Sequence, residues 1–416
     1  MIITEILFWI VYFLLLYTTI FIGLVFFENG IQKNKKKLTK IPRVSILIPA
    51  YNEQDTIGKT IKSVLNLNYP KNKLDIIVIN DGSTDKTEKI VKKFTKKGIT
   101  LINQKNRGKA AALNNGLKHA KGEFVACLDA DSVVEKNTLK KMVAYFSDNV
   151  HAVTPIMKVY RPKTLLQKLQ QFEYTIAAFL KMILSSIDCI HVTPGPFTIY
   201  RTKTIKQLGG FDENSIVEDQ EIAFRLQTHN KKIVQSTDGE ALSIAPRNFR
   251  ELFRQRSRWY RGSLLNLNKY RRMLFNPKYG DFGTFQLPSL LLGIFVAFFV
   301  LAMFVQNILI PIFRFFHQLF LINFDIKQMT YSGLIRLPTN LEIALFSLNI
   351  AKLILIMLFF VINIYWLMWA YKMTSEKMTV HKLIPLIFFF LIYYIIISFM
   401  WLGSIIELLM NKKGRW

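Results

Sequence analysis

Residues 124–132 read FVACLDADS, an apolar run that ends in two carboxylates, Asp129 and Asp131. Three earlier runs are also apolar and read as strands: RVSILIP (43–49), DIIVIN (75–80) and ITLIN (99–103). The segments between the strands have a helical spacing of apolar residues: 55–67, 84–97 and 108–120. This alternation predicts an α/β fold, with a mostly parallel sheet covered by helices on both faces.

Polar residues follow each predicted strand. In sheets of this kind ligands bind beyond the carboxyl ends of the strands, so these residues are candidates for a site. They are the residues just after Pro49, Asp81, residues 106–109, and Asp129 with Asp131. We expect the four groups to converge on one crevice.

Each of these groups has a structural and a functional interpretation. Asp129 and Asp131 could hold one hard divalent cation shared with a diphosphate, or Asp131 could cap the helical pattern at 137–146. Asp81 could accept a hydrogen bond from a nucleobase, or belong to a plain turn. Residues 106–109 (NRGK) could offer backbone N–H groups and a cation to a phosphate, or be a solvated helix start.

Two later segments also have an ordinary structural interpretation. Residues 218–221 (EDQE) begin a helical pattern, where acids ordinarily complement the helix dipole but could also include a catalytic base. Residues 194–196 (Pro-Gly-Pro) predict a rigid loop.

An arginine-rich and aromatic segment, RNFRELFRQRSRWYR (247–261), precedes the C-terminal apolar region. One interpretation is an amphipathic helix on anionic lipid, with Trp259 anchored at the headgroups. The other gives Arg258 a diphosphate and Trp259 the face of a sugar.

Composition separates the chain into apolar ends and a charged centre. Lys and Arg exceed Asp and Glu by 55 − 28, a formal charge of +27, while 51% of the residues are hydrophobic. This combination excludes a single soluble globule, a disordered acidic chain and a collagen-like fibre. With only Cys127 and Cys189, and no Cys-x-x-Cys pair, neither a disulfide framework nor a zinc site is expected.

Four apolar stretches are long enough to cross a bilayer: 6–27, 285–313, 343–371 and 383–406. Basic residues at 33–40 predict a cytoplasmic central region and an external N-terminus. Four spans would put the basic tail at 412–415 outside, against the positive-inside rule. Either one stretch is re-entrant or interfacial, or the count is wrong.

Taken together, the motifs resemble glycosyltransferase family 2, and within it the membrane-integrated polysaccharide synthases. The matching stretches are IPAYNE (48–53), INDGSTD (79–85), NRGKAAALNNG (106–116), CLDADS (127–132), VEDQE (217–221) and QRSRW (255–259). The last two narrow the resemblance to cellulose, chitin, hyaluronan and poly-N-acetylglucosamine synthases, with ceramide glucosyltransferase as a non-polymerising relative. The sequence departs from the usual pattern at Asn80, often Asp, and at Val217, usually Thr.

The resemblance implies a GT-A-type nucleotide-sugar-binding domain and a role for each matching residue. Asp219 would be the catalytic base, and Asp131 would bind Mg²⁺ or Mn²⁺. Trp259, Gly195 and Pro196 would bind the acceptor. The nucleotide-sugar would be bound by Ala50, Tyr51, Glu53, Asp81, Lys109, Asp129, Gln255, Arg256 and Arg258.

The expected organisation has four parts: 1–30, an N-terminal transmembrane helix; 40–245, a cytoplasmic glycosyltransferase domain; 246–283, amphipathic interface helices; 284–416, three C-terminal transmembrane helices. The expected protein lies in the cell membrane, where it would extend a polysaccharide from a UDP-sugar and translocate it.

Other interpretations stay open. A single-transfer glycolipid synthase would carry the same motifs, and a basic membrane-binding protein without activity would explain the charge alone. Membrane lipids and a glycan or lipid acceptor are expected partners, whereas nucleic acid is not. So few spans would make a narrow channel, which suggests an accessory membrane subunit or a homo-oligomer.

Overall fold

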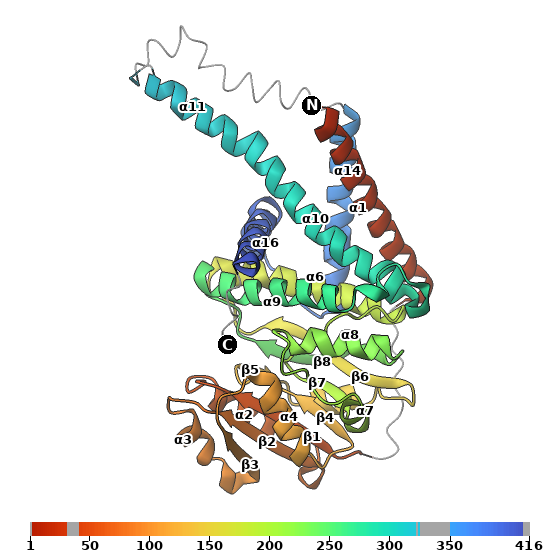
Figure 1. Ribbon diagram of the computed structural model, residues 1–416, viewed down its shortest axis with the longest axis vertical. Coiled ribbons are helices and arrows are strands. Elements are labelled where there is room, and N and C mark those ends of the chain that lie inside the picture. Colours follow the sequence, from red (N-terminus) through yellow and green to blue (C-terminus); the bar gives the residue numbers. More distant parts are fainter. Residues whose placement is uncertain (1, 31–40, 322, 325–349, 411–416) are drawn as a thin grey trace.

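The computed structural model describes residues 2–30, 41–321, 323–324 and 350–410. The basic segment at 33–40, the start of the apolar stretch at 343–371 and the basic tail lie outside the described residues. The described chain forms an α/β domain, a layer of long helices on top of it, and a group of upright helices above that layer (Figure 1).

The eight strands of the domain form one sheet in the order β3-β2-β1-β4-β7-β6-β8-β5. Strands β3, β2, β1 and β4 are mutually parallel, as are β6 and β8, whereas β7 and β5 run antiparallel to their neighbours. The strand bounds are β1 Val44–Ala50, β2 Leu74–Asp81, β3 Ile99–Gln104, β4 Phe124–Cys127, β5 Ser132–Val134, β6 Val150–Val159, β7 Thr198–Arg201 and β8 Lys232–Ser243. The predicted mostly parallel α/β sheet is confirmed, and the antiparallel strands were not anticipated.

Alternate residues of each central strand face opposite helical layers. In β1, Ile46 and Ile48 pack in the core beneath α2, whereas Leu47 packs with Leu113 of α4 on the other face. This period of two is what a strand buried on both faces produces. The helices of the domain are α2 Ile57–Leu65, α3 Thr87–Lys92, α4 Lys109–His119, α5 Thr138–Val143, α7 Thr202–Gln207 and α8 Glu218–Thr228.

Two long helices, α6 (Leu165–Ser186) and α9 (Phe249–Lys269), form the layer above the sheet (Figure 1). Thr164 caps α6 through the backbone N–H of Gln167, and Asn248 caps α9 through that of Glu251. Helix α9 lies within the predicted interface segment, whereas α6 was not foreseen as a separate helix.

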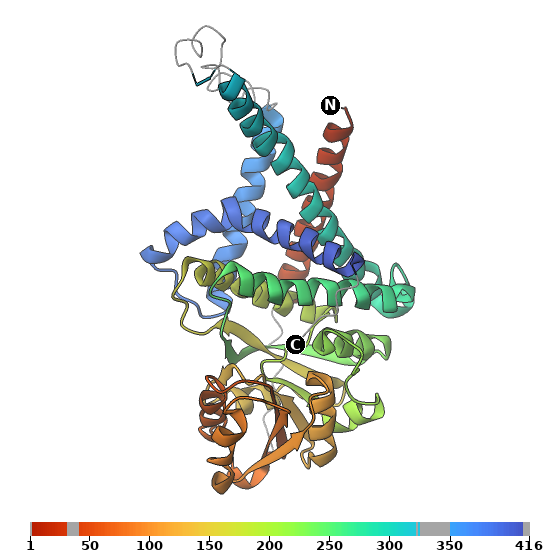
Figure 2. The same ribbon diagram turned by 60° about the vertical axis from the view of Figure 1, so that its left-hand side comes forward.

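The upright helices are α1 (Ile2–Asn29), α10 (Leu287–Phe304), which continues into α11 (Ile310–Leu321), and α14 (Ile350–Met373) (Figures 1 and 2). By length and composition, three helices in the described part of the chain could cross a membrane: Ile6–Asn29, Phe282–Phe304 and Val380–Leu409. Met357–Met373 of α14 is a shorter apolar helix.

The last helix differs in direction from the others. Residues Val380–Leu409, which contain α15 (Leu383–Phe388) and α16 (Tyr394–Leu409), lie across the top of α9, whereas the upright helices rise away from that layer (Figure 2). Contacts with α6 and α9 run along its length, from Tyr393 bonded to Glu173, through Trp401 stacked on Tyr260, to Glu407 bonded to Ser257.

Candidate functional site

Two adjoining cavities lie between the carboxyl ends of the strands and helix α9. The outer cavity has a volume of about 520 Å³ and includes Tyr51, Glu53 and Arg254 in its lining. The inner cavity has a volume of about 400 Å³, extends beneath α9 and includes Asp219 and Trp259. Five residues line both cavities and so mark their junction: Lys109, Asp129, Asp131, Gln255 and Arg258.

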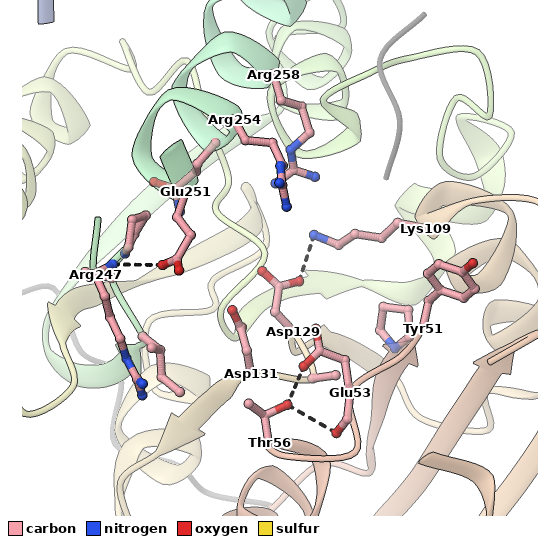
Figure 3. A pocket seen from close by; sticks show the side chains of 16 residues that line it. Tyr51, Glu53, Thr56, Lys109, Asp129, Asp131, Arg247, Glu251, Arg254 and Arg258 are labelled. Atoms are coloured by element: carbon pink, nitrogen blue, oxygen red, sulfur yellow. Dashed lines mark hydrogen bonds and ion pairs between the residues drawn. The ribbon is translucent and has the colours of Figure 1, made fainter. Parts of the chain in front are cut away.

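The loop after β4 carries the two aspartates into this junction (Figure 3). Strand β4 ends at Cys127, so Asp129 and Asp131 lie on the turn that follows it, which Ser132 N closes by donating to the Asp129 carbonyl. Burial, and then the Asp129 carboxylate, raise the pKa of Asp131 to about 6. The Ser132 hydroxyl lies 3.1 Å from Asp131 Oδ1.

Lys109 binds two carboxylates from different parts of the chain. Its Nζ lies 2.7 Å from Asp129 Oδ1 and 2.7 Å from Glu218 Oε1. Burial opposes a charged Lys109, but Asp129 and Glu218 together hold its pKa above the ordinary value. The ion pairs therefore keep this lysine protonated where α4 and α8 both begin.

Asp81 holds the loop that leads into Lys109. Its Oδ1 accepts hydrogen bonds from Gln104 Nε2 (2.7 Å) and Arg107 N (3.0 Å), and its Oδ2 accepts one from Gly108 N (2.9 Å). The neighbouring Gly82 has φ +72°, and a Cβ there would lie 2.7 Å from Asn106 N, so glycine is required. Asp81 and Ala50 are fully buried and are not part of the lining of either cavity.

Helix α9 presents two faces with different partners. Arg254, Gln255 and Arg258 line the outer cavity, and Figure 3 shows both arginines pointing toward Lys109 and Asp129. Gln255 Oε1 is buried and has no hydrogen-bond partner in the described part of the chain. A buried acceptor without a donor is costly, which makes this atom a natural contact for a ligand.

Arg256 points away from the outer cavity, toward α6. Its guanidinium lies 2.6 Å from Glu173 Oε2, and the Tyr393 hydroxyl donates to the same carboxylate oxygen at 2.6 Å. The guanidinium also lies 4.3 Å from the ring centre of Trp259 and so fixes that ring against the inner cavity. The structure thus places Arg256 in an ion pair beside the inner cavity, apart from Arg258.

Asp219 lies at the start of α8 and faces the inner cavity. Its carboxylate accepts a hydrogen bond from Gln220 N at 2.8 Å and, within the described residues, forms no ion pair. Burial, and then the neighbouring Glu218, raise the pKa of Asp219 to about 6. A carboxylate with a pKa close to neutral, and no cation bound to it, is suited to accept a proton from a substrate.

The Pro194-Gly195-Pro196 loop closes the inner cavity beside Asp219. The backbone carbonyl of Asp219 accepts hydrogen bonds from the N–H (3.2 Å) and hydroxyl (2.6 Å) of Thr193, which anchor this loop. A Cβ on Gly195 would lie 2.5 Å from Asp129 Oδ2 and 2.7 Å from Lys109 Nζ, so a larger residue there would displace this ion pair.

The donor set at the junction fits a divalent cation only with help from a ligand. Among the described residues, no group of three or more His, Cys, Asp and Glu could hold a metal ion. Asp129 is already paired with Lys109, whereas Asp131 has no cation partner in the described chain. Magnesium commonly uses one or two carboxylates and completes its shell with phosphate oxygens and water, and the junction fits that pattern.

Residues 45–209 match the model of a protein family described as glycosyl transferase family 2. These residues are a glycosyltransferase family 2 domain. The chain is 34% identical over 241 residues to the poly-beta-1,6-N-acetyl-D-glucosamine synthase of Staphylococcus epidermidis, covering 56% of this chain and 58% of that relative. It is 31% identical over 265 residues to the probable glycosyltransferase YdaM of Bacillus subtilis, covering 61% and 62%. The chain thus spans little more than half the length of these relatives.

The fold extends beyond the family 2 domain. The structure of the mannosyltransferase PcManGT from Pyrobaculum calidifontis, solved with GDP-Man and Mn²⁺, aligns with 97% of this chain and 99% of its own, with a TM-score of 0.61 and 17% identity. This likeness and the family match confirm the predicted GT-A-type fold, which is accompanied by apolar helices that could cross a membrane.

The site of the family 2 domain contains charged residues that sequence reasoning missed. The sequence pattern indicates an ordinary helix-start acid at Glu218, whereas the structure shows it as the second partner of Lys109. Arg254 belongs to no motif, but it precedes Arg258 by four residues and so shares its helical face. Lys181 of α6 lines the inner cavity and belongs to no sequence motif.

Proposed function

We propose that this protein is an inverting glycosyltransferase that moves a sugar from a UDP-sugar to a growing glycan at the cytoplasmic face of the cell membrane. The observation that carries the proposal is the position of Asp219, an acid without a cation partner in the described chain, beside the Asp129–Lys109–Arg258 junction. The name of the Staphylococcus epidermidis relative favours N-acetylglucosamine as the sugar.

The outer cavity would hold the donor. Tyr51 and Glu53 lie at its β1 end and suit the nucleoside, while Arg254, Arg258 and Lys109 converge on the position of the diphosphate. The Gln255 amide oxygen would accept a hydrogen bond from a hydroxyl group of the UDP-sugar. Asp131, with Asp129 beside it, would hold Mg²⁺ or Mn²⁺, which neutralises charge on the departing diphosphate. Ala50 and Asp81 support this cavity from behind.

The transfer step needs one base and one stabilised leaving group. Asp219 would take the proton of the acceptor hydroxyl as its oxygen forms a bond to the anomeric carbon of the donor. The bond from that carbon to the diphosphate oxygen breaks, and UDP leaves with the electron pair. Arg258 and Lys109 stabilise the charge that develops on UDP. Attack on the opposite face inverts the anomeric centre, and no covalent enzyme intermediate is needed.

The inner cavity would hold the acceptor. Trp259 offers an aromatic face to a sugar ring, and Gly195 and Pro196 form the opposite wall. The cavity continues to Leu290 of α10 and Trp401 of α16, so its far end lies among the apolar helices. This opening favours an acceptor that is attached to, or passes into, the membrane. A glycolipid synthase that transfers a single sugar is therefore the second candidate.

We also propose a topology with three crossings. Helices α1, α10 with α11, and α14 would cross the membrane, and Val380–Leu409 would lie flat at its cytoplasmic surface. Contacts from Tyr393 to Glu407 follow α6 and α9 over 14 residues, about 21 Å of helix, which a crossing helix would not do. The C-terminus would then be cytoplasmic, in accord with its basic residues. A glycan passing between so few crossings would need a second copy or an accessory membrane protein.

Purified protein incubated with radiolabelled UDP-N-acetylglucosamine and Mg²⁺ or Mn²⁺ tests the proposal. We expect metal-dependent transfer, abolished by Asp219→Asn, with UDP binding retained because Asp219 does not line the outer cavity. Asp188→Asn is the matched control, since Asp188 is paired with Lys232 outside both cavities. Long products would support a polymerase and a single sugar on lipid would support the second candidate. Wild-type turnover by Asp219→Asn would exclude the assigned base.

A further inference from the structure

The inner cavity contains a lysine for which the mechanism above has no use. Lys181 lies on α6, one helical turn after Ala177 and Ala178, and all three residues line this cavity. In the described part of the chain the Lys181 ammonium has no hydrogen bond and no carboxylate oxygen within 4.0 Å. A partly buried cation without a bound partner is costly unless a ligand supplies the partner.

Most acids around the inner cavity are already committed to other cations. Asp129 and Glu218 bind Lys109, and Glu173 binds Arg256. Asp219 is the acid whose charge acts on Lys181. Burial lowers the pKa of Lys181 to about 8, with Asp219 acting in the opposite direction, so the ammonium form still dominates at neutral pH.

His191 shapes the same wall of the cavity without adding charge. Gln286 Nε2 donates a hydrogen bond to the Nδ1 of His191 at 3.0 Å. Burial, and then the nearby Lys181, lower the pKa of His191 to about 4, so this imidazole is neutral at physiological pH. Lys181 is therefore the cation beside His191 in the described cavity. Its ammonium lies more than 4.0 Å from the Asp219 carboxylate, which leaves a gap between two side chains that line the same cavity.

We propose that the attacking hydroxyl of the acceptor sugar occupies this gap, with Lys181 as a further acceptor-binding residue. The hydroxyl oxygen accepts a hydrogen bond from the Lys181 ammonium while its proton points to the Asp219 carboxylate. As that proton moves to Asp219 and the oxygen bonds to the anomeric carbon, the ammonium stabilises the negative charge developing on the oxygen. Lys181 stays protonated throughout. The inference rests on the proposed function, because it takes Asp219 as the base.

The experiment compares Lys181→Met and Lys181→Arg with wild type. Lys168→Met is the matched control, because Lys168 lies on the same helix but lines neither cavity. Initial rates are measured with UDP-N-acetylglucosamine and an N-acetylglucosamine oligosaccharide of defined length, each varied in turn. UDP affinity, measured by calorimetry, reports whether each variant is folded.

We expect Lys181→Met to lower kcat/KM for the oligosaccharide by about a hundredfold, the usual loss when one stabilising donor is removed. The KM for UDP-N-acetylglucosamine and the affinity for UDP should stay within about twofold, and Lys181→Arg should restore part of the loss, since it keeps the cation. A purely structural role would not separate the two substrates in this way.

Two results would overturn the inference alone: acceptor kinetics of Lys181→Met that match those of Lys168→Met, or a rise in the KM for UDP-N-acetylglucosamine and a loss of UDP affinity as large as the loss in kcat/KM for the oligosaccharide. In both cases the wild-type protein still transfers sugar and the proposed function stands. Absence of transfer by the wild-type protein from every UDP-sugar would instead overturn the proposed function, and the inference with it.

Discussion

Lys109 Nζ lies 2.7 Å from Glu218 Oε1, and this ion pair joins the first residue of α4 to the first residue of α8. Through it, the loop after β3, which would contact the donor, is tied to the helix that carries Asp219. The pair also separates two adjacent acids by function. Glu218 is bound to a cation, while Asp219 faces the inner cavity.

Glu218→Gln should change the pH dependence of transfer. Glu218 raises the pKa of Asp219, which is about 6, and the charges of Lys109 and Arg258 lower it. A base must be unprotonated, so activity falls as the pH drops through this pKa. Removal of the Glu218 charge lowers the pKa and moves the acidic limb of the kcat profile to lower pH. Glu213→Gln, on an exposed ion pair with Arg107, serves as the control. An unmoved limb, or one moved upward, would contradict this account of Asp219.

Arg254→Ala should weaken donor binding. Arg254 lines the outer cavity beside Arg258 and points toward the Asp129 region (Figure 3). A hydrogen bond to a charged group contributes about 1.5–3 kcal/mol, so KM for the UDP-sugar should rise by roughly tenfold or more. Arg250→Ala is the matched control, because Arg250 lies on the same helix but outside the cavity lining. An equal KM for the UDP-sugar in the two variants would show that Arg254 does not bind the donor.

Substitution of Arg256 should lower stability, whereas substitution of Arg258 should lower UDP affinity. Arg256→Met leaves Glu173 without its cation, so we expect a loss of stability of up to about 3 kcal/mol, moderated because the Glu173 side chain is 29% exposed. Arg258→Met should reduce UDP affinity with little effect on thermal unfolding. Calorimetry and unfolding monitored by tryptophan fluorescence measure the two quantities.

A double variant tests whether the stability loss comes from the ion pair itself. Glu173→Gln combined with Arg256→Met should cost less than the sum of the single changes, since no charge is left unpaired. A loss of UDP affinity in Arg256→Met, at unchanged stability, would instead indicate that Arg256 binds the diphosphate.

The flat arrangement of Val380–Leu409 can be tested by labelling with a membrane-impermeant maleimide. Both native cysteines are buried, so single introduced cysteines give a clear signal. Lys377→Cys and Met410→Cys should react from the same side of the membrane, the side of the catalytic domain. Asn323→Cys, at the far end of α11, should react from the other side. Labelling of Lys377→Cys and Met410→Cys from opposite sides would indicate that Val380–Leu409 crosses the membrane, which would make four crossings.

The sequence was sufficient for the first half of the sheet and for its acidic strand ends. Apolar runs followed by Asp81 and Asp129 obey simple rules of parallel sheets, and the helices between them were correctly predicted. The sequence could not show which ligand-like side chains are consumed by the fold. Asp81 accepts hydrogen bonds from Gln104 at the end of β3 and from Arg107 and Gly108 of the following loop, an arrangement that no motif encodes.

Helical periodicity separates the two arginines of the motif. Residues on a helix advance by about 100°, so Arg256 lies about 200° from Arg258, and of the two only Arg258 also lines the outer cavity. The partner of Arg256, Glu173 of α6, lies 83 residues earlier in the chain and could not be found without the fold. The same holds for Lys181 of α6, because only the fold brings it into one cavity with Asp219 of α8.

The two faces of α9 have a practical consequence for biochemistry on this protein. One face points into the outer cavity, and another contacts α16, where Tyr260 stacks on Trp401 and Ser257 donates a hydrogen bond to Glu407. A detergent or lipid that displaces α16 therefore acts on the same rigid helix that carries Arg258. We expect kinetic constants measured in micelles to differ from those in nanodiscs, even where both preparations are monodisperse. Reconstitution is thus a variable of the enzymology and should be fixed before variants are ranked.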